Sequence, residues 1–330
     1  MDKKYIIGVD GGGTKTDYLL FTTEGERIDS VRVGSRSHEV LTGGFAEVET
    51  VLLSDLNNLL LKNSLDSSQI AAAVFGLAGI DTPTQLEQMT QILEKAKLNR
   101  FVVANDSVLG IKAGCPSGTG ICSINGTGTV VTGINERGEI LQIGGIGYAS
   151  GDSAGGGFIA GTVIRAAYDY YFRCGQSTIL TKKVMELFQI TNPLELLNAI
   201  SEKFYEKRDL DLHLLTALFE AVGEKDEVAV KIVQEISNQL AKSVAGCMKA
   251  LQFNHTPEVV LAGSVWVKSN CPLLISHFKE CVRNYSGKEI EPILLKVIPA
   301  AGAIIWAQEL AQNHPATLEQ RTRIINKITD

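Results

Sequence analysis

The sequence lacks the features that mark several common classes of protein. Its six cysteines are scattered through 330 residues without a CxxC pair, which argues against a zinc site and a disulfide framework. Its longest nearly apolar run, residues 297–307, is far shorter than the roughly 18 residues of a membrane span. Its first ten residues contain too few apolar positions for a signal-peptide core. We therefore expect a protein of the reducing cytoplasm without a membrane partner.

Positive charge is scarce in the first half of the chain. Residues 1–161 carry 12 Lys and Arg against 18 Asp and Glu, whereas residues 162–330 carry 19 of each. No basic patch stands out, so we expect no nucleic-acid partner. Phosphate groups bound in the first half would have to be held mostly by backbone amides, Lys15 and a divalent cation, because no cluster of arginines is present there.

Glycine is abundant in that same half. Of the 32 glycines, 26 fall in residues 8–161. Glycine serves where the backbone must take φ > 0 or lie close to another group, and the 45% hydrophobic content argues against disordered filler. The length predicts two domains, and the glycines predict that the N-terminal half handles a ligand.

The chain contains a weak internal repeat. Asp10-Gly11-Gly12-Gly13-Thr14 matches Asn125-Gly126-Thr127-Gly128-Thr129 at an offset of 115 residues. Each stretch begins a β-β-β-α-β-α unit. The first unit has expected elements at 5–9, 16–23, 28–33, 44–62, 70–77, 82–97, 101–104 and 107–114; the second has them at 121–125, 130–134, 259–261, 271–285, 290–298 and from 300. Such units predict an α/β fold whose ligands lie at strand ends.

The two glycine loops predict phosphate binding. Both carry Gly-x-Gly-Thr, at 11–14 and 126–129, and small residues there let amide N–H groups and threonine hydroxyls face an anion. Either loop alone could be a plain hairpin turn, but two matching loops favour phosphate. Asp10 lies beside the first loop and is the natural carboxylate for a divalent cation; the alternative is a turn-capping aspartate.

Asp106 is the best candidate for a general base. It ends an expected strand and opens a helix, whose N–H groups would stabilise its charged form. A phosphoryl-transfer enzyme needs such a carboxylate to accept the hydroxyl proton, whereas the alternative is an ordinary helix cap. Asp152, before another expected helix, has the same ambiguity. The dinucleotide-like string at 155–160 follows no expected strand, so we treat it as chance.

These residues resemble a known family. The first loop, Gly8 to Thr16, is similar to the first phosphate loop of the sugar kinase/Hsp70/actin superfamily, in the branch of N-acetylglucosamine kinases and BadF/BadG/BcrA/BcrD-type ATPases. Further segments resemble, in order, its catalytic-base segment, second phosphate loop, sugar-binding segment, adenosine motif and last connecting helix: Asn105-Asp106, Asn125–Thr129, Gly144–Asp152, Leu261–Ser264 and Ala300–Ala303. Together they span residues 6–303.

The resemblance implies two ribonuclease H-like (actin-like ATPase) domains around a cleft. They would cover residues 1–115 and 116–330, the second with a large helical insertion at about 153–254, and the last helix could pack back on the first domain. The protein would be an ATP- and Mg²⁺-dependent kinase of an amino sugar. Asp106 would be the base and Asp10 would lie in the magnesium region.

The remaining implied contacts fall into two groups. The residues implied to bind ATP are Asp10, Gly11, Gly12, Gly13, Thr14, Lys15, Thr16, Gly126, Thr127, Gly128, Thr129, Gly263 and Ser264. The residues implied to bind the sugar are His38, Asn105, Asp106, Thr127, Gly144, Gly145 and Asp152. A polar loop histidine such as His38, taken alone, is more often simply exposed.

Three departures from the family pattern concern the sugar. The family's Trp in GGWG is Ile146 here, the Glu of GDEGS is Ser153, and an Asn-His pair appears as Ser37-His38. Smaller groups at 146 and 153 could admit a bulkier sugar with a lactyl ether, such as N-acetylmuramic acid.

Other functions stay open on the sequence alone. An ATP-driven dehydratase activator would need cysteines for an iron–sulfur cluster, and Cys115 and Cys122 are the closest pair. That pair forms no compact cluster signature. A non-catalytic nucleotide switch is a further alternative, and a dehydrogenase remains only if a strand precedes residue 155. The sugar, its hydroxyl group and the oligomeric state, including a homodimer, are left undecided.

Overall fold

The computed structural model describes residues 4–205 and 210–329, which build two five-stranded sheets. The first sheet has the order β3-β2-β1-β4-β5 and the second the order β10-β9-β6-β7-β8. The strands of the first are β1 (Tyr5–Gly11), β2 (Lys15–Thr22), β3 (Arg27–Gly34), β4 (Ile70–Leu77) and β5 (Phe101–Ala104). Those of the second are β6 (Gly120–Asn125), β7 (Thr129–Ile134), β8 (Ile140–Gly144), β9 (Val259–Ala262) and β10 (Ile293–Leu294). Numbered within each sheet, both orders are 3-2-1-4-5, which agrees with two copies of one unit; β8, the third strand of the second copy, was not among the expected elements.

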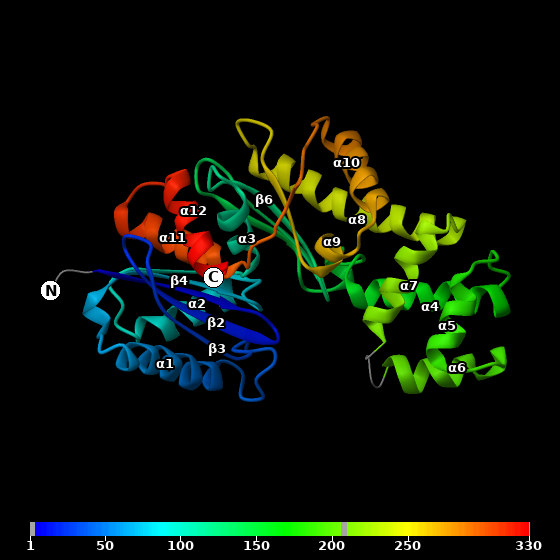
Figure 1. The fold of residues 1–330 in the computed structure, drawn as a ribbon, viewed down its shortest axis with the longest axis horizontal. Helices are drawn as coiled ribbons and strands as arrows, with labels where there is room; N and C mark the ends of the chain where they lie inside the picture. Colours follow the sequence, from blue (N-terminus) through cyan, green and yellow to red (C-terminus); the bar gives the residue numbers. More distant parts are fainter. Residues whose placement is uncertain (1–3, 206–209, 330) are drawn as a thin grey trace. The chain divides into compact units, whose positions relative to one another are not determined.

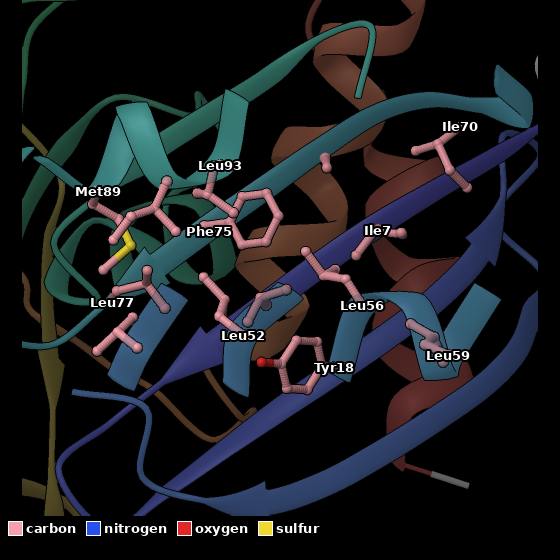
Figure 2. Packing of buried hydrophobic residues seen from close by; sticks show 14 of the residues in the cluster. Ile7, Tyr18, Leu52, Leu56, Leu59, Ile70, Phe75, Leu77, Met89 and Leu93 are labelled. Atoms are coloured by element: carbon pink, nitrogen blue, oxygen red, sulfur yellow. The ribbon is translucent and has the colours of Figure 1, made fainter. Parts of the chain in front are cut away.

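One face of the first sheet is covered by α1 (Gly44–Lys62) and α2 (Pro83–Glu94). Apolar residues of α1 recur at four- and three-residue spacing, namely Val48, Leu52, Leu56 and Leu59, so they form one buried stripe. Figure 2 shows this stripe packed against side chains of β1, β2 and β4, with Met89 and Leu93 of α2 completing the cluster. Thr82 caps α2 as predicted, in a reciprocal bond with Gln85.

The other face of this sheet is covered by α3 (Ser107–Gly114), α11 (Ala300–Gln312) and α12 (Leu318–Thr329). Figure 1 shows α11 and α1 on opposite sides of the sheet. The packing is tight: a Cβ on Gly8 would lie 2.8 Å from the Ile304 nitrogen, and one on Gly302 would lie 2.0 Å from the Leu109 carbonyl oxygen. Glycine at these two positions is therefore required by close contact between elements.

The chain divides into two compact units. One comprises Met1–Cys122, Thr132–Ile140 and Leu295–Asp330, and the other Ser123–Val131 and Leu141–Leu294. The division falls within β6 and β7, and α11 and α12 belong to the same unit as the first sheet.

Between β8 and β9 the described residues form helices and no strand. These are the 3₁₀ helices η2 (Tyr148–Ser150) and η3 (Pro193–Glu195), the π-helix η4 (Ile200–Tyr205), and the α-helices α4 (Gly156–Phe172), α5 (Leu180–Phe188), α6 (Leu196–Ala199), α7 (Asp211–Gly223) and α8 (Glu227–Leu251). Residues 206–209 of the stretch expected to be helical lie outside the described residues. After β9 come α9 (Ser264–Lys268) and α10 (Pro272–Ser286), which packs on α8. A further 3₁₀ turn, η1 (Ser67–Gln69), precedes β4.

Two expected elements differ from the structure. The strand expected at 290–298 is only Ile293–Leu294, an edge strand that follows Pro292, and proline cannot donate to a ladder. The residues expected as a polar tail form α12, which buries Ile324 against the first sheet. Among the helices that the structure describes, none combines the length and apolar composition needed to cross a membrane.

Candidate active site

The first glycine loop joins β1 to β2 as a tight hairpin. The Gly12 N–H donates to the Lys15 carbonyl oxygen at 2.9 Å, and the Ser35 hydroxyl donates to the Gly12 carbonyl oxygen at 2.9 Å. Gly13, Thr14 and Lys15 are exposed at its tip, whereas Thr16 is fully buried. A Cβ on Gly13 would have open space around it, and its φ is not positive. The fold itself therefore does not require glycine at position 13.

Asp10 lies at the end of β1, opposite Asp17 of β2. Burial and, secondly, the Asp17 carboxylate raise the pKa of Asp10 to about 6; Lys15, the Ala300 backbone N–H and Arg32 act in the opposite direction. Because burial and Asp17 disfavour the charged form of Asp10, a cation bound beside this carboxylate would be stabilising. No group of three or more potential metal ligands occurs within residues 4–205 and 210–329. Asp10 thus fits the way Mg²⁺ is often held, by one or two carboxylates together with substrate phosphates.

Asp106 immediately precedes α3, but it is not the ordinary helix cap that was the alternative to a general base. Its side chain makes no capping hydrogen bond, and the Asn105 side chain instead accepts from the Ser107 N–H at 3.0 Å. Burial, followed by the charges of Asp10 and Asp81, raises the pKa of Asp106 to about 7. The expected stabilisation of its charged form by backbone N–H groups is present, since backbone hydrogen bonds lower its pKa, but burial and two carboxylates outweigh it.

The Asn105 side chain connects two parts of this site. Its amide nitrogen donates to the Asp81 carboxylate at 2.9 Å, and its oxygen accepts from the Ser107 hydroxyl at 2.5 Å. The Ser107 hydroxyl also lies 2.5 Å from that of Thr132. The Asn105 side chain therefore links Asp81 to the start of α3, next to Asp106.

His38 is packed rather than simply exposed. Its ring stacks on Phe45 with the centroids 4.1 Å apart, and its Nε2 lies 3.3 Å from the Gln85 side-chain nitrogen. A Cβ on Gly79 would come within 2.9 Å of the His38 ring. This histidine is thus held in a defined position beside the loop that follows β4.

The second glycine loop lies under the start of α4. The Gly156 N–H donates to the Gly126 carbonyl oxygen at 2.8 Å, and a Cβ on Gly155 would lie 2.6 Å from the Thr127 carbonyl oxygen. Cβ atoms on Gly126 and Gly128 would meet nothing within 4 Å, and neither residue has a positive φ. Gly155 and Gly156, in the stretch that resembles a dinucleotide motif, therefore serve close packing. η2 and loop residues, not a strand, precede them.

The expected adenosine motif packs on the strand that leads into this second loop. Gly263 has φ +95°, and a Cβ there would lie 2.4 Å from the Asn125 carbonyl oxygen. The second glycine loop therefore contacts both Gly263, through Asn125 at its start, and the first turn of α4.

The segment 144–152 is a loop held together by Asp152. The Gly145 N–H donates to both Asp152 carboxylate oxygens, at 3.0 and 2.9 Å, and the Gly147 N–H donates to Oδ2 at 2.5 Å. The Ser150 hydroxyl lies 3.1 Å from Oδ2. Asp152 also lines a small cavity together with Thr129, which places this segment beside the second glycine loop. Ile146 is 69% exposed.

The cysteines do not form a cluster site. Cys115 and Cys122 are both buried and neither is in a disulfide bond, and burial raises the pKa of Cys122 above its ordinary value. Small buried thiols of this kind behave as apolar packing residues.

Sequence reasoning missed Asp17, Asp81 and Arg32. Asp17 and Arg32 come together through strand register, and Asp81 through the chain path after β4. The alternation of Lys15 and Asp17 along β2 was the one available signal, because it places both side chains on the same face of the strand.

Two sheets of one strand order, each with a glycine loop after its first strand, define an α/β protein of the actin-like ATPase class. A family model matches residues 7–307, and the chain belongs to the BadF/BadG/BcrA/BcrD ATPase family. The resemblance inferred from the loops is thereby confirmed.

Relatives with curated names are similar over nearly their whole length. An N-acetylmuramic acid/N-acetylglucosamine kinase of Clostridium acetobutylicum is 27% identical over 92% of this chain and 98% of its own. An N-acetyl-D-glucosamine kinase of Dictyostelium discoideum is 22% identical over 93% of this chain and 98% of its own. The solved structure of a candidate N-acetylglucosamine kinase from Chromobacterium violaceum covers 94% of this chain and 99% of its own, with a TM-score of 0.60 and 19% identity. That similarity confirms the fold.

Proposed function

We propose that this protein is an ATP-dependent kinase that transfers the γ-phosphoryl group of ATP to the 6-hydroxyl of an amino sugar such as N-acetylglucosamine or N-acetylmuramic acid. The observation that carries the proposal is the open space around three loop glycines, Gly13, Gly126 and Gly128. Neither positive φ nor packing requires glycine there, and all three lie in matching loops that each follow the first strand of a sheet, where small residues let backbone N–H groups approach a phosphate closely. The named activities of the two curated relatives support the sugar class.

The chemistry follows from the carboxylates of the first unit. Asp106 would accept the proton of the sugar hydroxyl as its oxygen bonds to the γ-phosphorus, while the bond from that phosphorus to ADP breaks. A base with a pKa of about 7 is suited to this task near neutral pH. Asp10 would hold magnesium, which, when bound, neutralises phosphate charge.

For the nucleotide and the sugar we propose the same contact residues that the family resemblance implies. Residues 11–16, 126–129 and 263–264 would bind ATP. His38, Asn105, Thr127 and the segment 144–152 would bind the sugar. We favour an acceptor with a lactyl ether, since Ile146 and Ser153 are smaller than the family's Trp and Glu. Because ATP is its cosubstrate, we expect the protein to act in the cytoplasm, and a homodimer stays open.

A screen of ADP release tests the proposal. The purified protein is assayed with hexoses, N-acetylglucosamine, N-acetylmuramic acid and their 6-deoxy analogues. Sugar-dependent ADP release that the 6-deoxy analogue abolishes is expected. Release that is independent of any sugar would contradict the kinase, and phosphorylation of N-acetylglucosamine without N-acetylmuramic acid would contradict the lactyl preference.

The Asp106→Asn variant tests the base. We expect turnover to fall by about three orders of magnitude or more, within the range general-base catalysis supplies, while ATP binding measured by calorimetry stays normal. Near-normal turnover would refute the role of Asp106.

A further inference from the structure

A row of three charged side chains crosses the first sheet beside the first glycine loop. Asp10 of β1 lies opposite Asp17 of β2, and Asp17 lies opposite Arg32 of β3. Side chains paired in this way project from the same face of a sheet. Ile6 and Phe21, farther along the same strands, belong to the cluster under α11. The charged row therefore continues that face toward the loop at 11–14.

Asp17 holds two cations. The Arg32 Nε lies 2.5 Å from Asp17 Oδ1 and Nη2 lies 3.0 Å from Oδ2, while the Lys15 Nζ lies 3.5 Å from Oδ2. The Asp17 side chain is 10% exposed, whereas those of Lys15 and Arg32 are 50% and 59% exposed. One nearly buried carboxylate thus fixes two accessible positive charges.

The Arg32 guanidinium retains donors for a second anion. A guanidinium has five N–H groups in a planar fork, and Asp17 occupies two of them along one edge. Among residues 4–205 and 210–329, no other side chain or backbone group accepts a hydrogen bond from Arg32 or forms an ion pair with it. The outer edge of the fork is therefore available, and this geometry matches two oxygens of a phosphate.

The position of Arg32 favours the nucleotide as that second anion. Lys15, the last residue of the loop, pairs with Gly34 of β3, two residues beyond Arg32. The Ser35 hydroxyl also ties the end of β3 to Gly12. The end of β3 and the glycine loop are thus joined at two points, so Arg32 keeps a defined position relative to the loop.

We propose that Arg32, oriented by Asp17, is a phosphate-binding residue of the nucleotide site and acts beside Lys15 on the polyphosphate of ATP. The inference rests on the proposed function only for the identity of the ligand as ATP. Arg32 would give the nucleotide site a second positive side chain beside Lys15, in a half of the chain that has few cations. Asp17 is a positioning residue in this arrangement, because it acts through Arg32 and Lys15.

Calorimetric titration without sugar tests the proposal, with ATP and AMP as ligands in the presence of Mg²⁺. The Arg32→Met variant should bind ATP about 10- to 100-fold more weakly, the range for lost hydrogen bonds to a charged group. AMP, which lacks the outer phosphates, should bind as it does to the wild type. Arg27→Met is the matched control: Arg27 lies on the same strand and donates to Ser30 and the Lys327 carbonyl oxygen, so ATP affinity should not change.

A double variant separates phosphate binding from simple neutralisation of Asp17. If Arg32 only balances that carboxylate, Asp17→Asn together with Arg32→Met should restore wild-type ATP affinity, and this result would overturn the proposal. If Arg32 binds phosphate, the double variant should bind ATP as weakly as Arg32→Met. Equal loss of ATP and AMP binding would also overturn it.

The conservative variant keeps the test decisive if Arg32→Met does not fold. Arg32→Lys retains the charge and loses the fork, so ATP affinity should fall about three- to tenfold; unchanged affinity would overturn the proposal. Since no sugar is present, these results do not depend on the acceptor. A failed sugar screen would refute the kinase alone.

Discussion

The acid limb of the pH–rate profile offers a direct test of the Asp106 site. A single base with a pKa of about 7 is about 9% ionised at pH 6 and about 91% at pH 8. With both substrates well below their KM values, kcat/KM reports the free enzyme and should fall at pH 6 to about a tenth of its plateau. The limb belongs to the coupled carboxyl groups of Asp10 and Asp106 rather than to one of them, because the Asp10 charge acts on Asp106 and the pKa of Asp10 is itself raised. A limb near pH 4 would refute the reasoning.

Asp81→Asn tests the cause of that raised pKa. The Asp81 charge raises the pKa of Asp106, and removal of a nearby like charge lowers the pKa of a carboxyl group by an amount on the order of one unit. Because Asp81 is partly exposed, we expect the acid limb to move down by about one pH unit. An asparagine oxygen can still accept from Asn105. Glu87→Gln, an exposed position on α2, is the control, and a limb that stays in place in Asp81→Asn would show that burial alone sets it.

Two further predictions concern glycines. Gly13→Val and Gly128→Val should fold with unchanged thermal stability, because a Cβ at either position meets nothing, yet both should weaken ATP binding at least about tenfold. Gly223→Val, equally unhindered at the end of α7, is the control and should leave ATP binding unchanged. Normal ATP affinity in both loop variants would argue against the phosphate loops. Gly302→Ala would place a methyl group 2.0 Å from the Leu109 carbonyl oxygen and force α11 from α3, at a cost of about 1–3 kcal/mol or more. Urea unfolding should show this loss, and wild-type stability would contradict the close contact.

Much of the fold could be predicted because each element carries its own periodicity. The stripe of α1, the cap of α2, the buried strand β4 and the strand β5, which is only partly buried, were all visible in local sequence. The repeat of the two glycine loops indicated two copies of one unit, and the two sheets do share a strand order. What could not be predicted is α12, whose polar composition conceals a buried residue at Ile324. Its packing depends on a partner surface distant in the chain.

In the candidate site, too, the residues that could be predicted are those with a local sequence signal. The glycine loops, Asp10 and Asp106 stand out because they follow strands directly. Asp17 and Arg32 do not, because their meeting depends on the register of β2 against β3, which single-sequence patterns leave open. The raised pKa of Asp106 was not foreseen, because it comes from burial and from the charges of Asp10 and Asp81, which lie far from Asp106 in the sequence.

The two carboxylate oxygens of Asp152 differ in their hydrogen-bond partners. Sequence reasoning made it a ligand for a sugar hydroxyl, whereas the structure shows both of its oxygens bonded to its own loop. Oδ2 accepts from Gly145, Gly147 and Ser150, but Oδ1 shares only the Gly145 N–H. A carboxylate has about four acceptor positions, so Oδ1 retains capacity for a hydroxyl while Oδ2 holds the loop. The two roles are therefore compatible in a carboxylate and not in an amide, whose nitrogen would face backbone N–H donors. Loss of sugar binding in an Asp152→Asn variant would consequently report the shape of the loop as well as the contact.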